Sequence, residues 1–321
     1  MNQNPLVSVI MSVFNGEKYL HEAVNSILKQ TYQHFEFIII DDSSTDTTFD
    51  ILQSYKKKDA RIIIIRKEKN YGAKGFIENL NIGLEHSKGQ YIARMDADDI
   101  SHTERLRLQV NFLHENPEIF LVGSNVETLD GGGNRTGILN APAEDSAIKK
   151  SMIKKISLYH PVIMFRNIPN IYYRPKMLYC EDYDLYFRLM TGGYLFANLE
   201  NPLLKYRILP HSISRQNHQL IRWLFVEKCR AFYKERREIG TDSYNKFEPD
   251  NYLNIFNIKY KNSLEDLLFA ARTAFKYNAT SDLQQIIEKA EFFYQGTSRF
   301  KKYKIALKFP KIVLPYLSKL N

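Results

Sequence analysis

The first 130 residues alternate short apolar runs with longer segments in which apolar residues recur every three or four positions. The β-branched runs are typical of buried strands, and the helical spacing between them predicts amphipathic helices. The predicted strands are Leu6–Phe14, Phe35–Asp41, Arg61–Arg66, Gln90–Met95 and Phe120–Leu129, and the predicted helices are Glu17–Lys29, Thr45–Lys57, Ala73–His86 and Ser101–Glu115. This alternation indicates an α/β fold with a mainly parallel sheet covered by helices on both faces.

The pattern changes beyond residue 130. The segment LDGGGNRTG (129–137) predicts a hairpin loop, SLYHPVIMFR predicts a strand, and a helix is expected to begin near Glu181. NPLLKYRILPHSISR predicts one more strand that runs into a loop, and the segments beyond Gln216 have helical periodicity. We therefore expect two parts, residues 1–215 as an α/β domain and residues 216–321 as a helical region.

The composition is that of a globular protein, with 44% hydrophobic and 25% charged residues. No apolar run approaches the roughly 18–20 residues that span a bilayer, and we expect no secretion signal at the N-terminus. Cys180 and Cys229 belong to no CxxC or Cys/His cluster. We therefore expect neither a disulfide framework nor a zinc site, and a reducing compartment.

The net charge of +9 is concentrated near the C-terminus, where every charged residue from Thr297 onward is basic. In RFKKYKIALKFPKIVLPYLSKL, lysines are mixed with aromatic and aliphatic residues, a pattern that suits an anionic membrane surface. A basic terminus with no such partner explains the pattern equally well.

Polar residues gather where three of the predicted strands end. Asn15 follows the first strand, Asp41 and Asp42 end the second, and the acidic sequence DADD (96–99) ends the fourth. The carboxyl ends of parallel strands meet at one edge of a sheet, and ligands bind at that edge. We expect a binding site there.

Asp96, Asp98 and Asp99 place three carboxylates within four positions, where they repel one another. A divalent cation turns this crowding into coordination, and Mg²⁺ or Mn²⁺ typically bridges such carboxylates to substrate phosphates. The alternative is that Asp99, with Ser101, caps the following helix. We favour the metal site.

Asp41 and Asp42 fit two interpretations equally, acids near a helix N-terminus and acceptors for the N–H and O–H groups of a nucleotide. Lys74, its neighbouring glycines and Arg94 are suited to approach a diphosphate. NYGAKG is not a Walker A loop, and no GxGxxG follows the first strand, which argues against a P-loop ATPase and a Rossmann dehydrogenase.

Glu181 and Asp182 begin a predicted helix, where the helix dipole alone favours acids. On residues alone this structural explanation leads, and a general base is the alternative. His160 and His211 are isolated histidines, which are more often structural hydrogen-bonding groups than ligands or catalysts.

Three stretches in order along the chain carry a family resemblance: PLVSVIMSVFNGEKYLHEAVNSILKQTYQHFEFIIIDDSSTDTT, NIGLEHSKGQYIARMDADDIS and CEDYDLYFRL. They resemble the inverting, nucleotide-sugar-dependent family 2 glycosyltransferases, and within them bacterial enzymes that build surface polysaccharides. The resemblance covers about residues 5–215. It implies the GT-A fold, a Rossmann-like mixed but mainly parallel sheet with flanking helices, followed here by the helical C-terminal region.

The resemblance also implies a donor site. Ser12 and Asp42 match positions that line a uridine pocket, Asp96 matches the acid of the DxD motif that contacts ribose, and Asp98 matches the acid that binds Mn²⁺ or Mg²⁺. Asp99 extends the cluster and is a possible second ligand. With the residues singled out above, the expected nucleotide-sugar site comprises Ser12, Asn15, Asp41, Asp42, Lys74, Arg94 and Asp96.

On the acceptor side, Asp182 matches the second acid of an ED motif, the general base, beside Glu181. His160 and Arg166 fall where relatives carry a histidine-proline pair and an arginine near the acceptor. The chain departs from its relatives at KYRILPHS, which has Leu209 where they often carry a histidine near the donor diphosphate. Either His211 takes over through a shifted loop, or the metal lacks that ligand.

We expect a transfer of galactose, glucose or an N-acetylhexosamine from a UDP-sugar to a hydroxyl of a bacterial capsule, O-antigen or lipooligosaccharide. The acceptor is expected to be a lipid-linked glycan, and the location the cytoplasm or the cytoplasmic face of the inner membrane. Alternatives are a sugar-phosphate nucleotidyltransferase, whose glycine- and arginine-rich opening loop is missing here, and a non-catalytic sugar-nucleotide-binding relative. We expect no nucleic-acid partner, because no such motif occurs.

Overall fold

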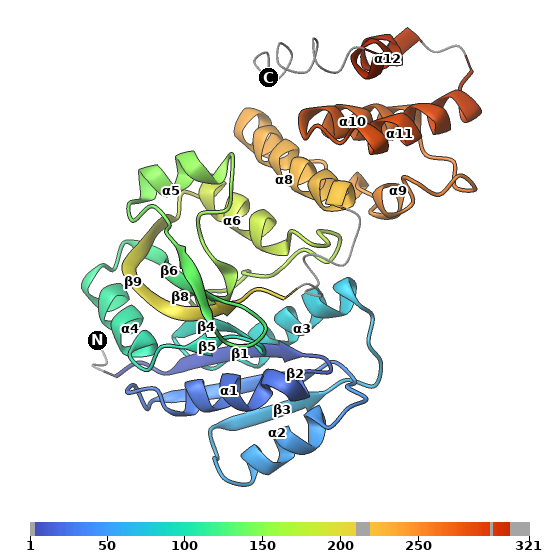
Figure 1. Cartoon of the computed structure of the whole chain (residues 1–321). Helices are drawn as coiled ribbons and strands as arrows, with labels where there is room; N and C mark the ends of the chain where they lie inside the picture. The colour runs from blue at the N-terminus through green and yellow to red at the C-terminus, as the bar shows by residue number, and fades with distance from the viewer. Residues whose placement is uncertain (1–3, 210–218, 296–297, 309–321) are drawn as a thin grey trace. The chain divides into compact units, whose positions relative to one another are not determined.

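The computed structural model describes residues 4–209, 219–295 and 298–308 (Figure 1). The described residues form two compact units. The first comprises residues 4–175 and 181–209, and the second comprises residues 176–180 together with those from 219 onward. Segment 176–180 therefore packs with the helical unit, whereas the sequence pattern had assigned it to the α/β domain.

The strands of the first unit form one sheet, in the order β3-β2-β1-β4-β8-β6-β9-β5, with β7 paired to β6. Their bounds are β1 Val7–Val13, β2 Phe35–Asp41, β3 Ile62–Arg66, β4 Tyr91–Asp96, β5 Ile100–Ser101, β6 Ile119–Leu129, β7 Arg135–Leu139, β8 Met164–Arg166 and β9 Leu195–Arg207. Strands β3, β2, β1 and β4 are parallel neighbours, and β8 joins them antiparallel. The α/β expectation is confirmed, with a parallel N-terminal half and a mixed second half.

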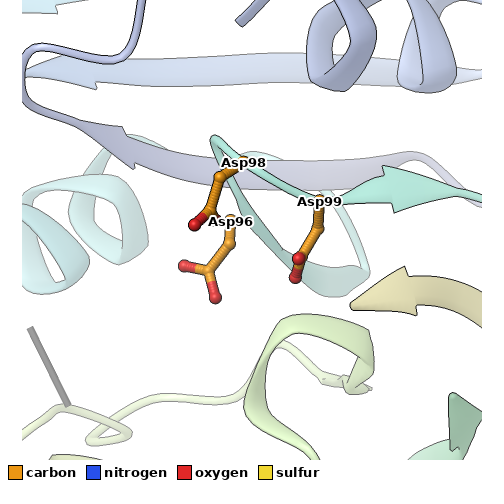
Figure 2. Close-up of side chains that lie close together, drawn as sticks. All are labelled: Asp96, Asp98 and Asp99. Atoms are coloured by element: carbon orange, nitrogen blue, oxygen red, sulfur yellow. The ribbon is translucent and has the colours of Figure 1, made fainter. Parts of the chain in front are cut away.

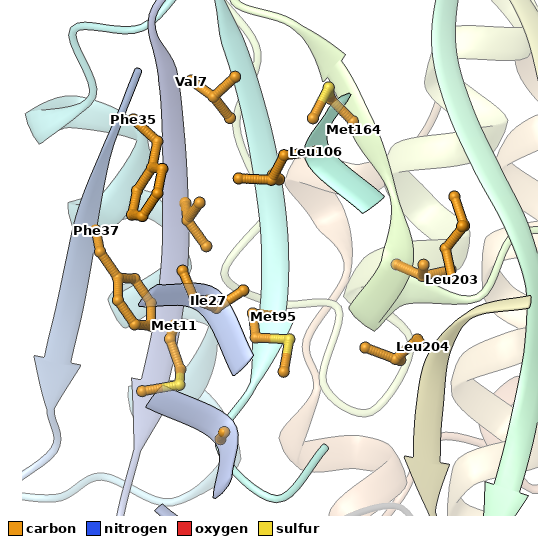
Figure 3. Packing of buried hydrophobic residues seen from close by; sticks show 14 of the residues in the cluster. Val7, Met11, Ile27, Phe35, Phe37, Met95, Leu106, Met164, Leu203 and Leu204 are labelled. Carbon is orange, nitrogen blue, oxygen red and sulfur yellow. The ribbon is translucent and has the colours of Figure 1, made fainter. Parts of the chain in front are cut away.

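Helices cover both faces of the parallel half. Helices α1 (Glu17–Leu28), α2 (Thr48–Lys56) and α4 (Arg105–Glu115) pack on the face that alternate strand residues such as Met11, Phe37 and Met95 present (Figure 3). Helix α3 (Ala73–His86) covers the other face, where a Cβ on Gly83 would lie 2.4 Å from Ile10 Cγ2. A larger residue at Gly83 would push α3 away from the sheet.

Helix α4 begins four residues later than its pattern predicts. Residues Ile100 and Ser101 form strand β5, which pairs antiparallel with β9, and the helix begins at Arg105. The N–H of Ser101 donates to Ser26 Oγ at 3.0 Å. The cap of α4 is Glu104, so the alternative that Asp99 and Ser101 cap this helix is wrong.

The rest of the first unit is built around the second half of the sheet. It contains α5 (Asp145–Met152), the short 3-10 helix η1 (His160–Val162) and α6 (Glu181–Thr191). The carboxyl ends of β1, β2 and β4 lie at one edge of the sheet because these strands are parallel. In that register Ser12 lies beside Asp96 on one side and Ile40 on the other.

The second unit is helical. Its helices are α8 (Gln219–Ile239), α9 (Asp250–Leu253), α10 (Leu264–Lys276), α11 (Thr280–Phe293) and α12 (Lys301–Lys308), with 3-10 turns η2 (Tyr244–Lys246) and η3 (Ser298–Phe300). Its buried Lys289 donates to the carbonyl oxygens of Asn254 at 2.8 Å and Ile255 at 3.1 Å, and burial lowers the pKa of this ammonium to about 8. Within the described ranges, no helix is both long and apolar enough for a bilayer crossing.

Candidate functional site

Three carboxylates meet where β4 ends. Asp96 is the last residue of β4, and Asp98 and Asp99 follow in the loop before β5. One oxygen from each lies within 4.8 Å of the others. Figure 2 shows the three side chains extending to the same side of this loop. The sequence alone predicts this cluster, because the acids stand next to one another.

Crowding and burial hold protons on this cluster. Burial, and then the charge of Asp96, raise the pKa of Asp98 to about 7. The same two causes raise the pKa of Asp99 well above its usual range. A divalent cation relieves both effects, since it replaces the protons as the source of positive charge.

Asp99 is fully buried and binds the backbone of a distant strand. Its Oδ1 accepts a hydrogen bond of 2.7 Å from the N–H of Arg207 on β9. Its Oδ2 is buried and has no hydrogen-bond donor among the described residues. One oxygen therefore joins β9 to the acidic loop, and the other fits a cation as a ligand. This unpartnered oxygen and the crowded oxygen donors suit Mg²⁺ or Mn²⁺.

The side chain of Arg207 fixes the same loop from the other direction. Its Nε donates to the carbonyl oxygen of Asp98 at 2.9 Å, and its Nη2 lies 2.6 Å from Glu22 Oε2 on α1. The guanidinium also stacks over the ring of Tyr19, with 4.3 Å between its central carbon and the ring centroid. Arg207 thus holds the acidic loop between α1 and β9.

Arg94 is the buried cation of the site. Its Nη1 lies 2.5 Å from Asp96 Oδ2, and its side chain lies on the strand face that also bears Asp96. Burial opposes its charge, but the carboxylate of Asp96 prevails and raises the pKa of Arg94. The carbonyl oxygen of Arg94 accepts a 2.7 Å hydrogen bond from Arg105 Nη2. Arg105 is itself fully buried and supports β4 from the α4 side.

Glu181 and Asp182 form the first turn of α6. Burial, and then the charge of Asp182, raise the pKa of Glu181 to about 8. The charges of Arg94 and Asp96 also act on Glu181, which puts this acidic pair and the DADD cluster in one electrostatic site. Asp182 is partly exposed, and its Oδ1 accepts from the N–H of Tyr183 at 2.7 Å.

His160 lies in the wall of this site. It is buried, and its Nε2 lies 2.8 Å from the hydroxyl of Tyr173. Burial, and then the charge of Arg94, lower the pKa of His160 well below its usual range, so the ring is neutral. Asn81 of α3 holds the backbone of Tyr173 by two hydrogen bonds, of 2.7 and 2.8 Å. The arrangement is that of a structural histidine that supports the site.

A second cluster surrounds Asp42 at the end of β2. Its Oδ2 accepts from Asn70 Nδ2 at 3.0 Å, and its Oδ1 lies 3.4 Å from Lys67 Nζ. On α3, Asn79 Nδ2 donates to Ser12 Oγ at 3.0 Å. Oδ1 of Asn79 is buried and accepts no hydrogen bond from the described residues, and the equally buried Oδ1 of Asp42 has the Lys67 ammonium as its charge partner. These carboxylate and amide oxygens suit the N–H and O–H donors of a nucleoside.

The other predicted donor residues shape the rim of the site. Asn15 has φ 48°, and its Oδ1 accepts from the N–H of Thr45 at 2.9 Å, which ties the loop after β1 to the loop after β2. Asp41 is fully buried, accepts from the N–H of Ser44 at 3.2 Å, and lies 3.3 Å from Arg66. Lys74 is exposed on the first turn of α3.

Two predicted site residues remain, Arg166 and His211. The structure places Arg166 away from the acidic edge, because it pairs with Tyr91 at the start of β4, five residues before Asp96. Its guanidinium donates to the carbonyl oxygens of Ile119, Leu113 and Asn116, so its role is to anchor the end of α4. An acceptor-side role for Arg166 is therefore wrong. His211 lies outside the described residues.

The sequence analysis missed Asn79, Tyr173 and Tyr206. Tyr206 lies on β9 close to the acidic cluster, since burial and the charges of Asp96, Asp99 and Asp98 raise its pKa. Asn79 could have been found, because Gly75, Asn79 and Gly83 form an unusual small and polar stripe on an otherwise apolar helix face. Nothing local in the sequence singles out the two tyrosines.

The chain belongs to glycosyl transferase family 2, whose sequence profile matches residues 8–180. It is similar to an uncharacterized glycosyltransferase of Haemophilus influenzae, with 33% identity over 91% of this chain and 94% of the relative. A putative teichuronic acid biosynthesis glycosyltransferase of Bacillus subtilis, TuaG, is 31% identical over 73% of this chain and 89% of its own. The protein is thus a family 2 glycosyltransferase.

A third relative is Escherichia coli WfaP, the UDP-Glc:alpha-D-GlcNAc-diphosphoundecaprenol beta-1,3-glucosyltransferase. It is 33% identical over 65% of this chain and 80% of its own length. Among solved structures, Staphylococcus aureus TarS 1-349 in complex with UDP-GlcNAc superposes with a TM-score of 0.61 at 17% identity, covering 94% of this chain and 92% of that one. That likeness establishes the GT-A fold.

Proposed function

We propose that this glycosyltransferase is metal-dependent and inverting, and that it transfers a hexose or N-acetylhexosamine from a UDP-sugar to a hydroxyl of a lipid-linked glycan. The observation that carries the proposal is the meeting of two acidic groups around buried Arg94. Arg94 lies 2.5 Å from Asp96 of the acidic cluster, and the charge of Glu181, which adjoins Asp182, acts on Arg94 as well. The acidic cluster serves the donor, where it would hold the cation, and the Glu181–Asp182 pair serves the acceptor, where Asp182 would act as the base.

The donor half of the site is formed by the parallel strand ends. Asp42 and Asn79 offer buried oxygen atoms that accept hydrogen bonds from a uracil or ribose, and Ser12 lies beside Asp96 in the register. Asp98, with Oδ2 of Asp99, would hold a divalent cation, which offsets the charge of the departing diphosphate when bound. The WfaP name and the TarS complex support UDP as the nucleotide.

The acceptor half supplies the base. Asp182 is partly exposed at the start of α6, where an acceptor hydroxyl can reach it. It takes the hydroxyl proton while the oxygen attacks the anomeric carbon opposite the leaving diphosphate, and this single displacement inverts the centre. Burial, and then the charge of Asp182, raise the pKa of Glu181 to about 8, which favours its protonated form near neutral pH.

The acceptor class rests on WfaP, whose name specifies a diphosphoundecaprenol-linked acceptor. A lipid-linked acceptor calls for a location in the cytoplasm at the inner face of the membrane. In α12 the exposed side chains Lys301, Lys302, Ile305 and Lys308 lie on one helix face, which suits an anionic surface. The remainder of the basic tail, 309–321, lies outside the described residues.

A donor screen tests the proposal. UDP-, GDP- and dTDP-sugars are incubated with the protein, with and without Mn²⁺, and nucleotide release is measured with and without a polyprenyl-diphosphate acceptor. The proposal expects release from a UDP-sugar that needs the cation and increases with the acceptor. Activity with dTDP- or GDP-sugars alone, or full activity in a chelator, contradicts the donor or the metal assignment respectively.

A further inference from the structure

We propose that Cys180 and Cys229 are a redox-active pair that oxidises to an intramolecular disulfide and joins segment 176–180 to helix α8. The two Sγ atoms lie 3.2 Å apart, although the residues are 49 positions apart in sequence. Both residues are thiols in the structure and are fully buried in the helical unit. They are the only cysteines in the chain, so each has one possible intramolecular partner.

Segment 176–180 is held firmly enough to keep the two sulfurs together. The N–H of Lys176 donates to the hydroxyl of Tyr244 at 3.2 Å, and its Nζ donates to the carbonyl oxygen of Phe247 at 2.7 Å. Tyr179 packs edge-on against Phe225 of α8, with 5.9 Å between the ring centroids. Because these contacts already hold the two sulfurs next to each other, little further entropy is lost when they react.

The backbone of this segment is strained as well as anchored. Tyr179 has φ 63°, a left-handed conformation that an aromatic residue rarely adopts. Glycine would relieve that strain, so the packing of the Tyr179 ring on Phe225 must maintain it. The next residue is Cys180, whose Sγ contacts the carbonyl oxygen of Met177 at 3.8 Å. The short loop therefore presents Cys180 in one orientation.

Oxidation by a peroxide forms the disulfide in two steps. One thiol attacks the peroxide, forms a sulfenic acid and releases one water. The second sulfur then attacks the sulfenic sulfur, the disulfide forms, and the hydroxyl leaves as a second water with the remaining thiol proton. Hydrogen peroxide is the oxidant that the proposal names.

The disulfide has a consequence for transfer that rests on the proposed function. Cys180 directly precedes Glu181 and Asp182. Bond formation draws the sulfurs from 3.2 Å to about 2.05 Å, and the chain on either side must follow. A shift of about 1 Å at a catalytic group lowers the rate strongly. We expect the oxidised protein to transfer sugar about tenfold more slowly, with recovery on reduction.

Intact-mass spectrometry of the full chain before and after peroxide tests the pair. The expected product is a monomer that has lost two hydrogen atoms, has no titratable thiol after denaturation, and yields a linked peptide containing both cysteines. The variants Cys180→Ser and Cys229→Ser should not form it. Addition of oxygen atoms without loss of two hydrogens, or mainly disulfide-linked dimers, would overturn the proposal.

Activity is measured on the same samples. Wild type should slow after peroxide and recover with dithiothreitol, while Cys229→Ser should keep its rate throughout. If the disulfide forms but the rate is unchanged, the link to Asp182 is wrong although the pair is redox-active. If no sugar is transferred before oxidation, the proposed function fails, and the mass measurement still decides the disulfide.

Discussion

The N–H of Arg207 donates a 2.7 Å hydrogen bond to Oδ1 of Asp99, across 108 residues of sequence. This bond separates the roles of two neighbouring acids. Asp99 is fully buried and holds β9 against the acidic loop, whereas Asp98 is crowded by Asp96 and only partly buried. Removing Asp99 therefore costs fold stability, and removing Asp98 costs mainly function.

A pair of alanine variants tests this separation. Asp99→Ala leaves the N–H of Arg207 buried without an acceptor, which should lower the free energy of unfolding by about 1–3 kcal/mol. Asp98→Ala removes a repelled carboxylate and should leave stability unchanged or slightly higher. Urea denaturation in a metal-free buffer compares them. Equal losses in both variants would contradict the assignment.

Cation binding should depend on Asp98. We expect Asp98→Asn to weaken Mn²⁺ binding at least about tenfold. Even the substitution of a residue that only hydrogen-bonds a metal ligand typically lowers metal affinity by about 10- to 100-fold. Electron paramagnetic resonance of free Mn²⁺, titrated in the presence of UDP, measures this directly. The matched control is Asp59→Asn, because Asp59 pairs with Arg61 just before β3 begins, away from the acidic edge. An unchanged titration with Asp98→Asn would refute its role as a ligand.

Glu181 should make stability depend on pH. Burial and Asp182 raise its folded-state pKa to about 8, above the ordinary 4.5, so the folded protein retains a proton that the unfolded chain releases. The free energy of unfolding should therefore fall as the pH rises from about 4.5 to about 8. Glu181→Gln removes this contribution, and urea curves at several pH values should show a smaller fall than in wild type. If the free energy of unfolding falls equally with pH in wild type and in Glu181→Gln, the raised pKa of Glu181 is wrong.

Arg207 should matter more than its partner on α1. Its guanidinium is almost fully buried and binds the Asp98 carbonyl oxygen, whereas the Glu22 side chain is 57% exposed. An exposed partner contributes little, so Glu22→Gln should cost less than about 1 kcal/mol of stability and little activity. Arg207→Lys cannot maintain the stacking and both hydrogen bonds, and should lower activity more strongly. Steady-state rates of sugar transfer by the two variants test whether Arg207→Lys is the more damaging substitution.

The fold and the acidic edge could be predicted because their signals are local. β-branched runs such as the one ending at Asp41 make strands, and parallel strands bring their carboxyl ends together. The start of α4 was misplaced because Ser101 pairs with distant Leu204, and no local pattern shows that pairing. Arg166 was misassigned for the same reason, since its carbonyl partners lie about 50 residues away, at Leu113 and Asn116.

The thiol pair shows the same limit. Cys180 and Cys229 are 49 residues apart and belong to no known cysteine motif. Their sulfurs lie together only because segment 176–180 packs with the helical unit. Asn79 could have been predicted, because the glycines on the same helix face indicate that the helix lies close to the sheet. A small-residue stripe on a buried helix face is therefore a usable signal for a site.

Asp182 is proposed above as the base of a UDP-sugar-dependent transfer. The most direct measurement compares kcat for sugar transfer in wild type, Asp182→Asn and the control Asp59→Asn, with UDP affinity measured in parallel. We expect Asp182→Asn to lower kcat by about 10²–10⁴ while UDP affinity and the control rate stay unchanged. A kcat for Asp182→Asn within about twofold of wild type would contradict it.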